Sequence, residues 1–355
     1  MCLFAIAAIA PATLAQWTVT NLHPTGALHS RALGTGSGEQ AGYAQLGPTV
    51  GHIRASLWNS TALSWTNLHP VGTVYSIAFG ADSAQQVGEV FPTGLPHAAL
   101  WTGTVASWVD LNPPPTDGYV HSSEAFAVRA GKQVGYLIAV GGVNSAALWS
   151  GSAATLVNLH PPGAYSSWAH GVSDGQQVGR VQLVPGGAQN ACLWTGSASS
   201  FVNLHPAVAD NSQALAVRAG RQVGSVIFGG VRRASLWTGT AASWVNLSSF
   251  LPASFSHAEA TGISIDGGQI RIVGYGFNTS TFRDEAILWT MAVPPPPCPA
   301  DINGDHSVNT SDLTLLLSRF GQSVPSGTQG DLNGDGTVNT ADLVLLLNAF
   351  GSACP

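Results

Sequence analysis

A unit of about 40–50 residues recurs along most of this chain and constrains its fold more than any other feature. Each copy contains four short runs of apolar and β-branched residues bounded by Gly, Ser or Thr, which is the pattern of four strands joined by tight turns. The copy at 212–247 shows the runs most clearly, ending in Leu-Trp-Thr-Gly-Thr and Trp-Val-Asn-Leu. Repeats of this size with four strands each are typical of the blades of a β-propeller.

Three anchor motifs each occur six times, which predicts a six-bladed, all-β propeller. Gln-Val-Gly or a variant of it begins at Gln40, Gln86, Gln133, Gln177, Gln222 and, in degraded form, before Val273; Leu-Trp begins at Leu57, Leu100, Leu148, Leu193, Leu236 and Leu288; Asn/Asp-Leu begins at Asn21, Asn67, Asp110, Asn158, Asn203 and Asn246. Asn21 precedes the first complete copy, and Leu288 has no Asn-Leu pair after it. We therefore expect Trp17–Leu22 to pair as the outer strand of the last blade, which would close the ring and protect its sheet edges.

The spacing of the anchors separates a uniform face from a variable one. The first-strand Ser precedes the Gln anchor by ten residues, and Leu-Trp precedes Asn/Asp-Leu by ten residues, in five copies each. The other two connections vary by several residues and lie on the opposite face of an antiparallel blade. Variable loops on a rigid scaffold are where binding usually occurs, so we expect any ligand on that face.

Charge and hydropathy exclude two classes of partner. Residues 1–292 contain twelve acids and eleven bases, so the propeller has no basic footprint for nucleic acid. No apolar run after the N-terminus is long enough to span a membrane. Residues 1–15 are apolar and end in Ala-Thr-Leu-Ala, which favours a secretory signal cleaved before Gln16, although the positive n-region is missing and the signal would then begin further upstream. A buried N-terminal strand is the alternative.

Residues 298–355 carry two twelve-residue loops rich in oxygen side chains, after a Pro-rich linker at 291–297. Oxygen ligands fall at positions 1, 3, 5, 7, 9 and 12, which is the spacing that wraps a Ca²⁺ ion. We predict two calcium ions, held by Asp301, Asn303, Asp305, Ser307, Asn309 and Asp312 and by Asp331, Asn333, Asp335, Thr337, Asn339 and Asp342. Position 6 is Gly336 in the second loop but His306 in the first, so we expect the first site to be the weaker.

Each loop runs into one apolar helix, expected at 312–320 and 342–350, and no helix is expected before either loop. This duplicated loop–helix arrangement resembles a type I dockerin. The resemblance implies a cohesin partner contacted by positions 10 and 11 of each loop, here Thr310, Ser311, Thr340 and Ala341, and their similarity implies docking in two orientations. A calcium-stabilised cap without a partner is the alternative. Cys298 and Cys354 bracket this small module, and a disulfide between them would suit an exported protein.

The repeat at about 17–290 resembles the extracellular HAF-repeat family, through its Gly-x-Gln-Val-Gly, Ala-x-Leu-Trp and Asn-Leu elements. Members of that family generally have no assigned activity. The Trp of the Leu-Trp anchor recurs in every copy, which indicates that it packs in the core between blades. Trp168 follows the first-strand Ser, where no other copy has a Trp, so it is the better candidate for a ligand contact. The histidines of the Asn-Leu-His-Pro elements recur once per blade, which places them too far apart for one metal and favours solvated or turn-bonding roles.

Glu124 and Glu259 are the catalytic candidates, because both follow the first-strand Ser in blades that face each other across a six-fold ring. Glycoside hydrolysis needs two carboxylates about 5–9.5 Å apart, so the hypothesis depends on geometry. The leading interpretation is a secreted, non-catalytic binding or scaffold propeller, with a signal at 1–15, the propeller at 16–290 and a calcium-dependent tether to a cohesin-type partner or cell surface at 298–355. The ligand would be a glycan or a protein. The alternatives are a polysaccharide hydrolase or lyase delivered by the tether and a purely structural envelope protein.

Overall fold

The computed structural model describes residues 20–92, 94–114, 119–266, 269–292, 298–325 and 328–354. The chain divides into two compact units, Met1–Met291 and Ala292–Pro355, and each is described by itself. The signal expected at 1–15 and most of the linker, residues 293–297, lie outside the described residues.

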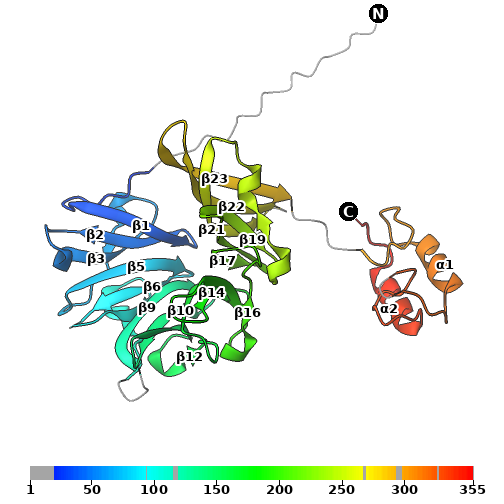
Figure 1. The fold of residues 1–355 in the computed structure, drawn as a ribbon, viewed down its shortest axis with the longest axis horizontal. Helices are drawn as coiled ribbons and strands as arrows, with labels where there is room; N and C mark the ends of the chain where they lie inside the picture. Colours follow the sequence, from blue (N-terminus) through cyan, green and yellow to red (C-terminus); the bar gives the residue numbers. More distant parts are fainter. Residues whose placement is uncertain are drawn as a thin grey trace, which may run out of the picture. The chain divides into compact units, whose positions relative to one another are not determined.

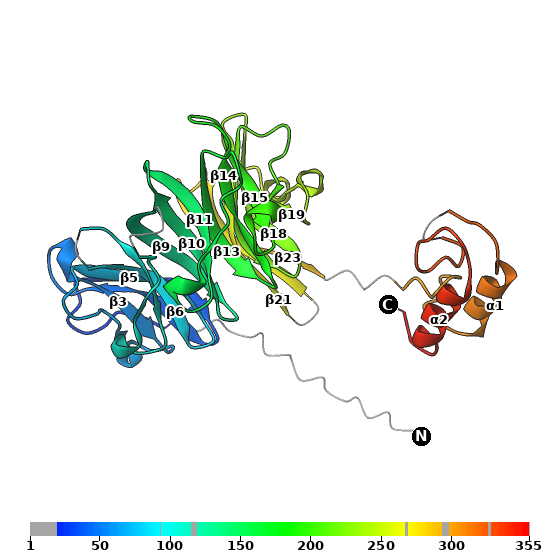
Figure 2. The same cartoon turned by 90° about the horizontal axis from the view of Figure 1, so that it is seen from below.

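The first unit consists of six antiparallel sheets that follow one another in chain order, from blue to yellow in Figures 1 and 2. In the first five sheets the four strands lie in sequence order, and the sixth has three strands among the described residues. The strands are β1 (His29–Gly36), β2 (Glu39–Gln45), β3 (Ile53–Trp58), β4 (Thr66–Asn67); β5 (Tyr75–Asp82), β6 (Gln85–Phe91), β7 (His97–Trp101), β8 (Val109–Asp110); β9 (Tyr119–Arg129), β10 (Lys132–Ala139), β11 (Val143–Trp149), β12 (Val157–Asn158); β13 (Ser166–Ser173), β14 (Gln176–Gln182), β15 (Gln189–Trp194), β16 (Val202–Asn203); β17 (Asn211–Arg218), β18 (Arg221–Phe228), β19 (Val231–Trp237), β20 (Val245–Asn246); and β21 (Phe255–Asp266), β22 (Gln269–Asn278), β23 (Arg283–Ala292).

The uniform face is built by two short turns that the Gln anchor ties together. The first turn of each of the first five sheets has two residues with positive φ, for example Ala130 (48°) and Gly131 (75°), which is the hairpin turn that matches strand twist. Gln133 Nε2 donates to the carbonyl of Gly131 at 3.0 Å, and Gln133 Oε1 accepts from Gly151 N at 2.8 Å. Gln177 and Gln222 make the same pair of bonds.

One turn of 3₁₀ helix connects the third and fourth strands of each of the first five sheets. These are η2 (Ala62–Ser64), η3 (Val105–Ser107), η4 (Ala153–Thr155), η5 (Ala198–Ser200) and η6 (Ala241–Ser243); η1 (Val50–His52) and η7 (Leu247–Phe250) lie in other loops. By contrast, the connections between second and third strands range from Gly229–Gly230 to residues 46–52. The sequence spacing therefore separated the two faces correctly.

A β-bulge at the same place in all six first strands turns one side chain out of the ladder. The six bulge residues are Leu33, Phe79, Phe126, His170, Leu215 and Thr261. Phe126 contacts Phe79 (centroids 5.9 Å apart) and stacks on His170 (5.3 Å), so the bulges of neighbouring sheets meet. The first strands of consecutive sheets pack on one another from β1 to β21, which makes them the innermost strands.

Apolar side chains fill the space between neighbouring sheets. Trp101 of the second sheet packs with Ala41 and Leu57 of the first sheet and with Ala78 of its own sheet. Trp149, Trp194 and Trp237 repeat this packing at the next joints. Each of these indoles is fully buried. The prediction that the recurrent tryptophans form core between blades is therefore confirmed, and burial of such large aromatics contributes much of the packing energy.

The histidines of the Asn-Leu-His-Pro elements bond to the turn and to the next sheet. His160 Nε2 donates to the carbonyl of Ala164 at 3.0 Å, so its Nδ1 accepts from Ser167 Oγ at 2.8 Å. Ser167 Oγ in turn accepts from Ala146 N of the preceding sheet at 2.8 Å. His205 makes the same chain of bonds. These histidines have the turn-bonding role that we expected, and the chain of bonds joins successive sheets.

The sixth sheet differs from the others in its outer strand. Residues 1–19 lie outside the described residues, and Thr20–Leu22 do not form a strand, so the expected closing strand is absent from the described part of the chain. Leu288 of β23 is 51% exposed, whereas its counterpart Leu100 in β7 is 3% exposed. The structure thus shows six propeller-like sheets without the predicted closure.

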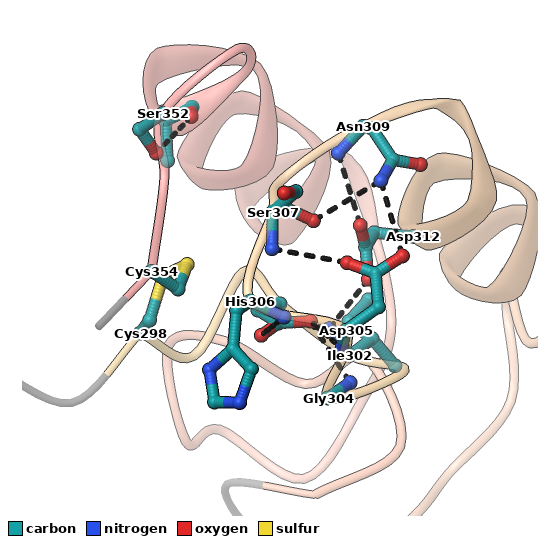
Figure 3. Close-up of a disulfide and its surroundings, with 12 residues drawn as sticks. Cys298, Ile302, Gly304, Asp305, His306, Ser307, Asn309, Asp312, Ser352 and Cys354 are labelled. Carbon is teal, nitrogen blue, oxygen red and sulfur yellow. Dashed lines mark hydrogen bonds between the residues drawn. A yellow bond between two sulfur atoms is a disulfide. The ribbon is translucent and has the colours of Figure 1, made fainter. Parts of the chain in front are cut away.

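The second unit contains two helices, α1 (Thr310–Ser318) and α2 (Thr340–Ala349). Both begin two residues earlier than predicted, because Asn309 and Asn339 act as N-caps and Asp312 and Asp342 complete capping boxes. A small core of Val308, Leu316, Val338, Leu346 and their neighbours lies between the helices and loops. A disulfide joins Cys298 to Cys354 (Figure 3).

Candidate functional site

The first calcium loop gathers three carboxylates around one point. One oxygen from each of Asp301, Asp305 and Asp312 lies within 4.8 Å of the others. Backbone N–H groups hold them in place: Gly304 and His306 donate to Asp301, and Ile302 and Asn303 donate to Asp312 (Figure 3). The loop therefore converges its acidic groups before any cation is considered.

The second loop repeats the same bonds thirty residues later. Gly334 and Gly336 donate to Asp331 at 2.9 Å each, and Leu332 donates to Asp342 at 2.8 Å. Asp331 and Asp342 are almost completely buried. The backbone of each loop also pairs with the segment after the opposite helix, through bridges Ser307–Ala353 and Ser323–Thr337. The two loops are thus related by a two-fold internal symmetry.

The donor set fits a hard divalent cation. Carboxylate and amide oxygens are the ligands that Ca²⁺ prefers. Six acids lie in residues 298–355 together with a single base, Arg319, whose Nη1 donates to Gln329 rather than to a loop carboxylate. Hydrogen bonds from Asn303 and Asn309 lower the pKa of Asp305, so this group stays ionised.

Asn309 and Asn339 have a second role that the sequence interpretation did not assign. Their side-chain oxygens accept from Ser311 N at 2.7 Å and from Ala341 N at 2.8 Å, as the N-caps of α1 and α2. Their amide groups donate to Asp305 and Asp335. Position 9 of such loops often reaches calcium through a water molecule, which is compatible with this capping role.

His306 adopts the left-handed backbone conformation that Gly336 adopts in the second loop, with φ of 68° and 84° respectively. A residue with a Cβ atom pays about 1–2 kcal/mol there. We expect His306→Gly to tighten calcium binding at the first site by about fivefold, which corresponds to about 1 kcal/mol. The reciprocal change Gly336→His should weaken the second site. Calorimetric titration of both variants checks this, and equal affinities in all three proteins would contradict it.

The four residues at the predicted docking positions are accessible. Thr310, Ser311, Thr340 and Ala341 form the exposed first turns of α1 and α2. Beyond them, both helices expose large apolar side chains: Leu315 and Leu317 on α1, and Val344, Leu345 and Leu347 on α2, each 41–55% exposed. Exposed apolar surface of this density on a small module marks a protein interaction site.

The structure places the two catalytic candidates in different clusters. Glu124 accepts from Tyr136 Oη at 2.6 Å, and burial raises its pKa. Its acidic neighbour is Glu89 of the preceding sheet, whose pKa is raised to about 7 by burial and by the charge of Glu124. Sequence spacing did not identify Glu89, because its position follows from the packing of one sheet on the next.

Glu259 lies between the fifth and sixth sheets, and no interaction with Glu124 is present among the described residues. It accepts from Ser225 at 2.7 Å, Tyr275 at 2.8 Å and Gln213 at 2.6 Å, and it pairs with Arg232 at 3.0 Å. Burial by itself would raise its pKa, but these bonds and the arginine outweigh it and lower the pKa. Glu259 is thus a firmly held carboxylate, and the two glutamates do not form a pair.

Trp168 pairs across the ladder with Arg180, whose guanidinium lies 4.7 Å from the centroid of the indole ring. We use the term belt for the first-strand residue after the recurrent Ser together with its partner on the second strand. In the first sheet the belt pair is Arg31 opposite Tyr43, and in the second sheet it is Ile77 opposite Glu89. The belt lies near the variable face. Five different residue pairs occupy it, because the third and sixth sheets share a Glu–Tyr pair, Glu124 with Tyr136 and Glu259 with Tyr275.

Comparison with known proteins identifies the two units separately. Residues 299–351 match the family model described as Dockerin type I domain. A comparison with curated protein sequences found no match. The β-propeller domain of the Trilobed protease from Pyrococcus furiosus is 10% identical, with a TM-score of 0.50 over 76% of this chain and 84% of that one.

Two further solved structures are similar at lower TM-scores. They are a prolyl endopeptidase (13% identity, TM-score 0.47, 72% of this chain and 41% of that one) and TolB from Acinetobacter baumannii (11%, 0.41, 71% and 64%). The chain spans less than two thirds of either protein. At these identities the likeness concerns the fold alone.

No described helix is long and apolar enough to cross a membrane. Dockerin type I domains bind calcium and imply a cohesin partner, and the aspartate cluster and the disulfide are consistent with such a module. The chain therefore carries a dockerin type I domain at its C-terminus, next to an all-β unit with a propeller-like fold.

Proposed function

We propose that this chain is a secreted binding protein that attaches through its C-terminal dockerin, with two calcium ions, to a cohesin domain. The observation that carries the proposal is the duplicated calcium loop with matching exposed residues on both helices. The disulfide and the apolar segment at 1–15 support export, because disulfides persist in oxidising compartments. We further propose that the propeller repeat belongs with the extracellular HAF repeats.

The two-fold symmetry of the module gives the docking hypothesis a sharp test. Either helix can present the same kind of surface, so changing Thr310 and Ser311 to Asp should leave cohesin binding through α2 nearly intact. The same change at Thr340 and Ala341 should leave binding through α1. The variant with all four substitutions should bind cohesin with an affinity at least about a hundredfold lower, since both orientations then bury unpaired charge. Calorimetry against a panel of type I cohesins measures this.

Loss of binding after the two substitutions on one helix alone would contradict the two-orientation model. A wild-type chain that binds none of the cohesins would contradict the proposed tether. Substitution of Thr314, which bonds to its own helix at the carbonyl of Thr310, serves as the matched control on the same helix.

We also propose that Trp17–Leu22 closes the propeller by pairing with β23. His23 bonds to Ser30 at 2.9 Å and to Ala27 at 3.0 Å, as the equivalent histidines do at the other joints. At those joints the serine also accepts from the third-strand Ala of the preceding sheet. The equivalent residue here is Ala286, which is exposed, and no bond from it to Ser30 is present. The joint thus has half of its bonds in place.

The register of the other sheets, Leu57 opposite Thr66 and Leu236 opposite Val245, places Thr20 opposite Leu288. A Thr20→Cys/Leu288→Cys variant should therefore form a disulfide on mild oxidation. Directly opposed residues bring their Cβ atoms to about 4.5–5.5 Å. A Thr20→Cys/Thr290→Cys variant, out of register by two residues, should not. Mass spectrometry after proteolysis distinguishes them, and equal cross-linking of both would contradict the register.

The propeller would supply the binding function through its variable face. Glu124 and Glu259 occupy separate sheet interfaces, which favours binding over glycoside hydrolysis, because hydrolysis needs two carboxylates across one bond. The belt, whose residue pair varies among the sheets, is the part of this face most suited to recognising one ligand.

A further inference from the structure

Arg180 is a partly buried cation with no acidic partner among the described residues. Its Nη1 donates to the neutral side chains of Gln189 at 3.0 Å and Gln213 at 3.4 Å. Its Nε is buried without any hydrogen-bond partner. Burial lowers its pKa, and no carboxylate opposes this effect. Burying a charge is costly unless an opposite charge compensates it.

A half-buried ion pair of the same region shows what is missing at Arg180. Arg232 lies one sheet further on and bonds to Glu259, which is itself held by three neighbours. Besides its two glutamines, Arg180 has the face of Trp168, a cation–π contact that compensates a buried charge less than a carboxylate does. The buried His170 is uncharged, because burial and then the charge of Arg180 lower its pKa to about 3.

A cavity of about 190 Å³ opens beside this guanidinium, between the fourth and fifth sheets. Two of its lining residues are arginines, Arg180 and Arg232, and none is acidic. The remaining lining consists of Gln189, Asn211, Ser212, Gln213, Ser225 and Ile227. Glu259 neutralises Arg232 and accepts from Gln213 and Ser225, so the guanidinium of Arg180 carries the uncompensated charge at this polar cavity.

We propose that this cavity binds the carboxylate of an acidic sugar residue, with Arg180 as the group that pairs with it. A planar guanidinium matches a carboxylate in a two-pronged geometry, and no carboxylate of the described residues occupies that of Arg180. Side-chain amides such as those of Gln189 and Asn211 suit the ring hydroxyls of a sugar. The single aliphatic residue, Ile227, leaves little surface for the apolar side chain of a peptide.

A second, larger hollow of about 620 Å³ continues from the cavity and shares Ile227 and Arg232 with it. Gly230 of the loop between β18 and β19 and Val231, the first residue of β19, line this hollow, so it lies on the variable face. His257 in its wall stacks on Phe277, with the rings 5.5 Å apart. The larger hollow, whose lining includes Asp284 as well as Arg232, has room for the next unit of a sugar chain that ends in the acidic sugar.

This inference rests on the proposed binding role of the propeller, and its test uses the full chain with calcium. Digalacturonate and its methyl ester, which has the same skeleton without the charge, are titrated by calorimetry. We expect binding of the acid and at least tenfold weaker binding of the ester, since a hydrogen-bonded charge pair is lost. Arg180→Gln should reduce binding of the acid at least tenfold, while Arg221→Gln, on the uniform face, should not change it.

Thermal unfolding of Arg180→Gln separates a ligand site from a structural one. Removal of an uncompensated buried charge should not lower the unfolding temperature, whereas loss of a structural arginine should. Equal binding of acid and ester, or an unchanged affinity of Arg180→Gln, overturns the site. Competition by inorganic sulfate as strong as that of digalacturonate overturns the sugar class. Cohesin binding is measured on the same proteins, so that failure of the sugar site can be distinguished from failure of the proposed tether.

Discussion

Removing calcium with EGTA unfolds residues 298–355 and leaves the propeller folded. Without a cation, the carboxylates of Asp301, Asp305 and Asp312 repel one another within 4.8 Å, and the same repulsion acts in the second loop. The apolar core of this module contains only six buried residues, which is too few to offset that cost. At a calcium concentration one hundred times the dissociation constant, two ions contribute about 5 kcal/mol.

The chain provides a separate spectroscopic probe for each unit. All eleven tryptophans lie at positions 17–289, so their fluorescence reports the propeller alone. The two α-helices of the described residues lie in the dockerin, so circular dichroism at 222 nm reports that module. EGTA should abolish the helical signal and leave the fluorescence transition unchanged, and calcium should restore the helices.

An unchanged helical signal in EGTA would show that the disulfide and core suffice without the ion. A fluorescence transition that moved together with the helical signal would show that the propeller also depends on calcium. Adding magnesium in place of calcium is the matched control, because its strict octahedral geometry suits these loops poorly.

Gly135→Ala destabilises the propeller by about 3 kcal/mol or more, the upper range for overpacking. Gly135 lies on β10 opposite the bulge at Phe126, where a Cβ atom would overlap the carbonyl oxygen of Glu124 and the Cα of Ala125. Both obstacles are backbone, so neither can move without breaking the ladder. The fluorescence-detected unfolding temperature should fall by about 6–12 °C.

Gly51→Ala is the matched control for this change. Gly51 lies in η1, its φ is not in the left-handed region, and a Cβ there would meet nothing closer than 3.8 Å. Its substitution should leave the unfolding temperature within about 2 °C, a shift that corresponds to less than 1 kcal/mol. A fall for Gly135→Ala no larger than that for Gly51→Ala would contradict the close approach of β9 and β10.

The prediction extends to the equivalent glycines of the other sheets. A Cβ at Gly88 or Gly224 would overlap the carbonyl oxygen of Ile77 or Gln213 in the same way. This close approach is the physical reason for the Gly of the Gln-Val-Gly anchor. The Gln of the same anchor has a different reason, since it ties two turns of the uniform face together.

The sequence by itself determined the features that depend on local spacing. The ten-residue separations predicted which turns are uniform, because a two-residue hairpin and a single 3₁₀ turn tolerate no change in length. The twelve-residue loops predicted which carboxylates converge, because the ligands of one ion follow one another along a short stretch of chain. The helix starts were two residues late, because the capping asparagines were interpreted only as ligands.

Only the tertiary structure decided which side chains meet across sheets. Strand alternation gives the face of a residue but not its neighbour on the next sheet, which depends on how the sheets pack and on a bulge that shifts the register by one residue. For this reason Glu124 lies beside Glu89 rather than Glu259, and Arg180 meets Gln213 and a polar cavity. Both contacts join residues more than thirty positions apart, and no periodicity in the chain records them.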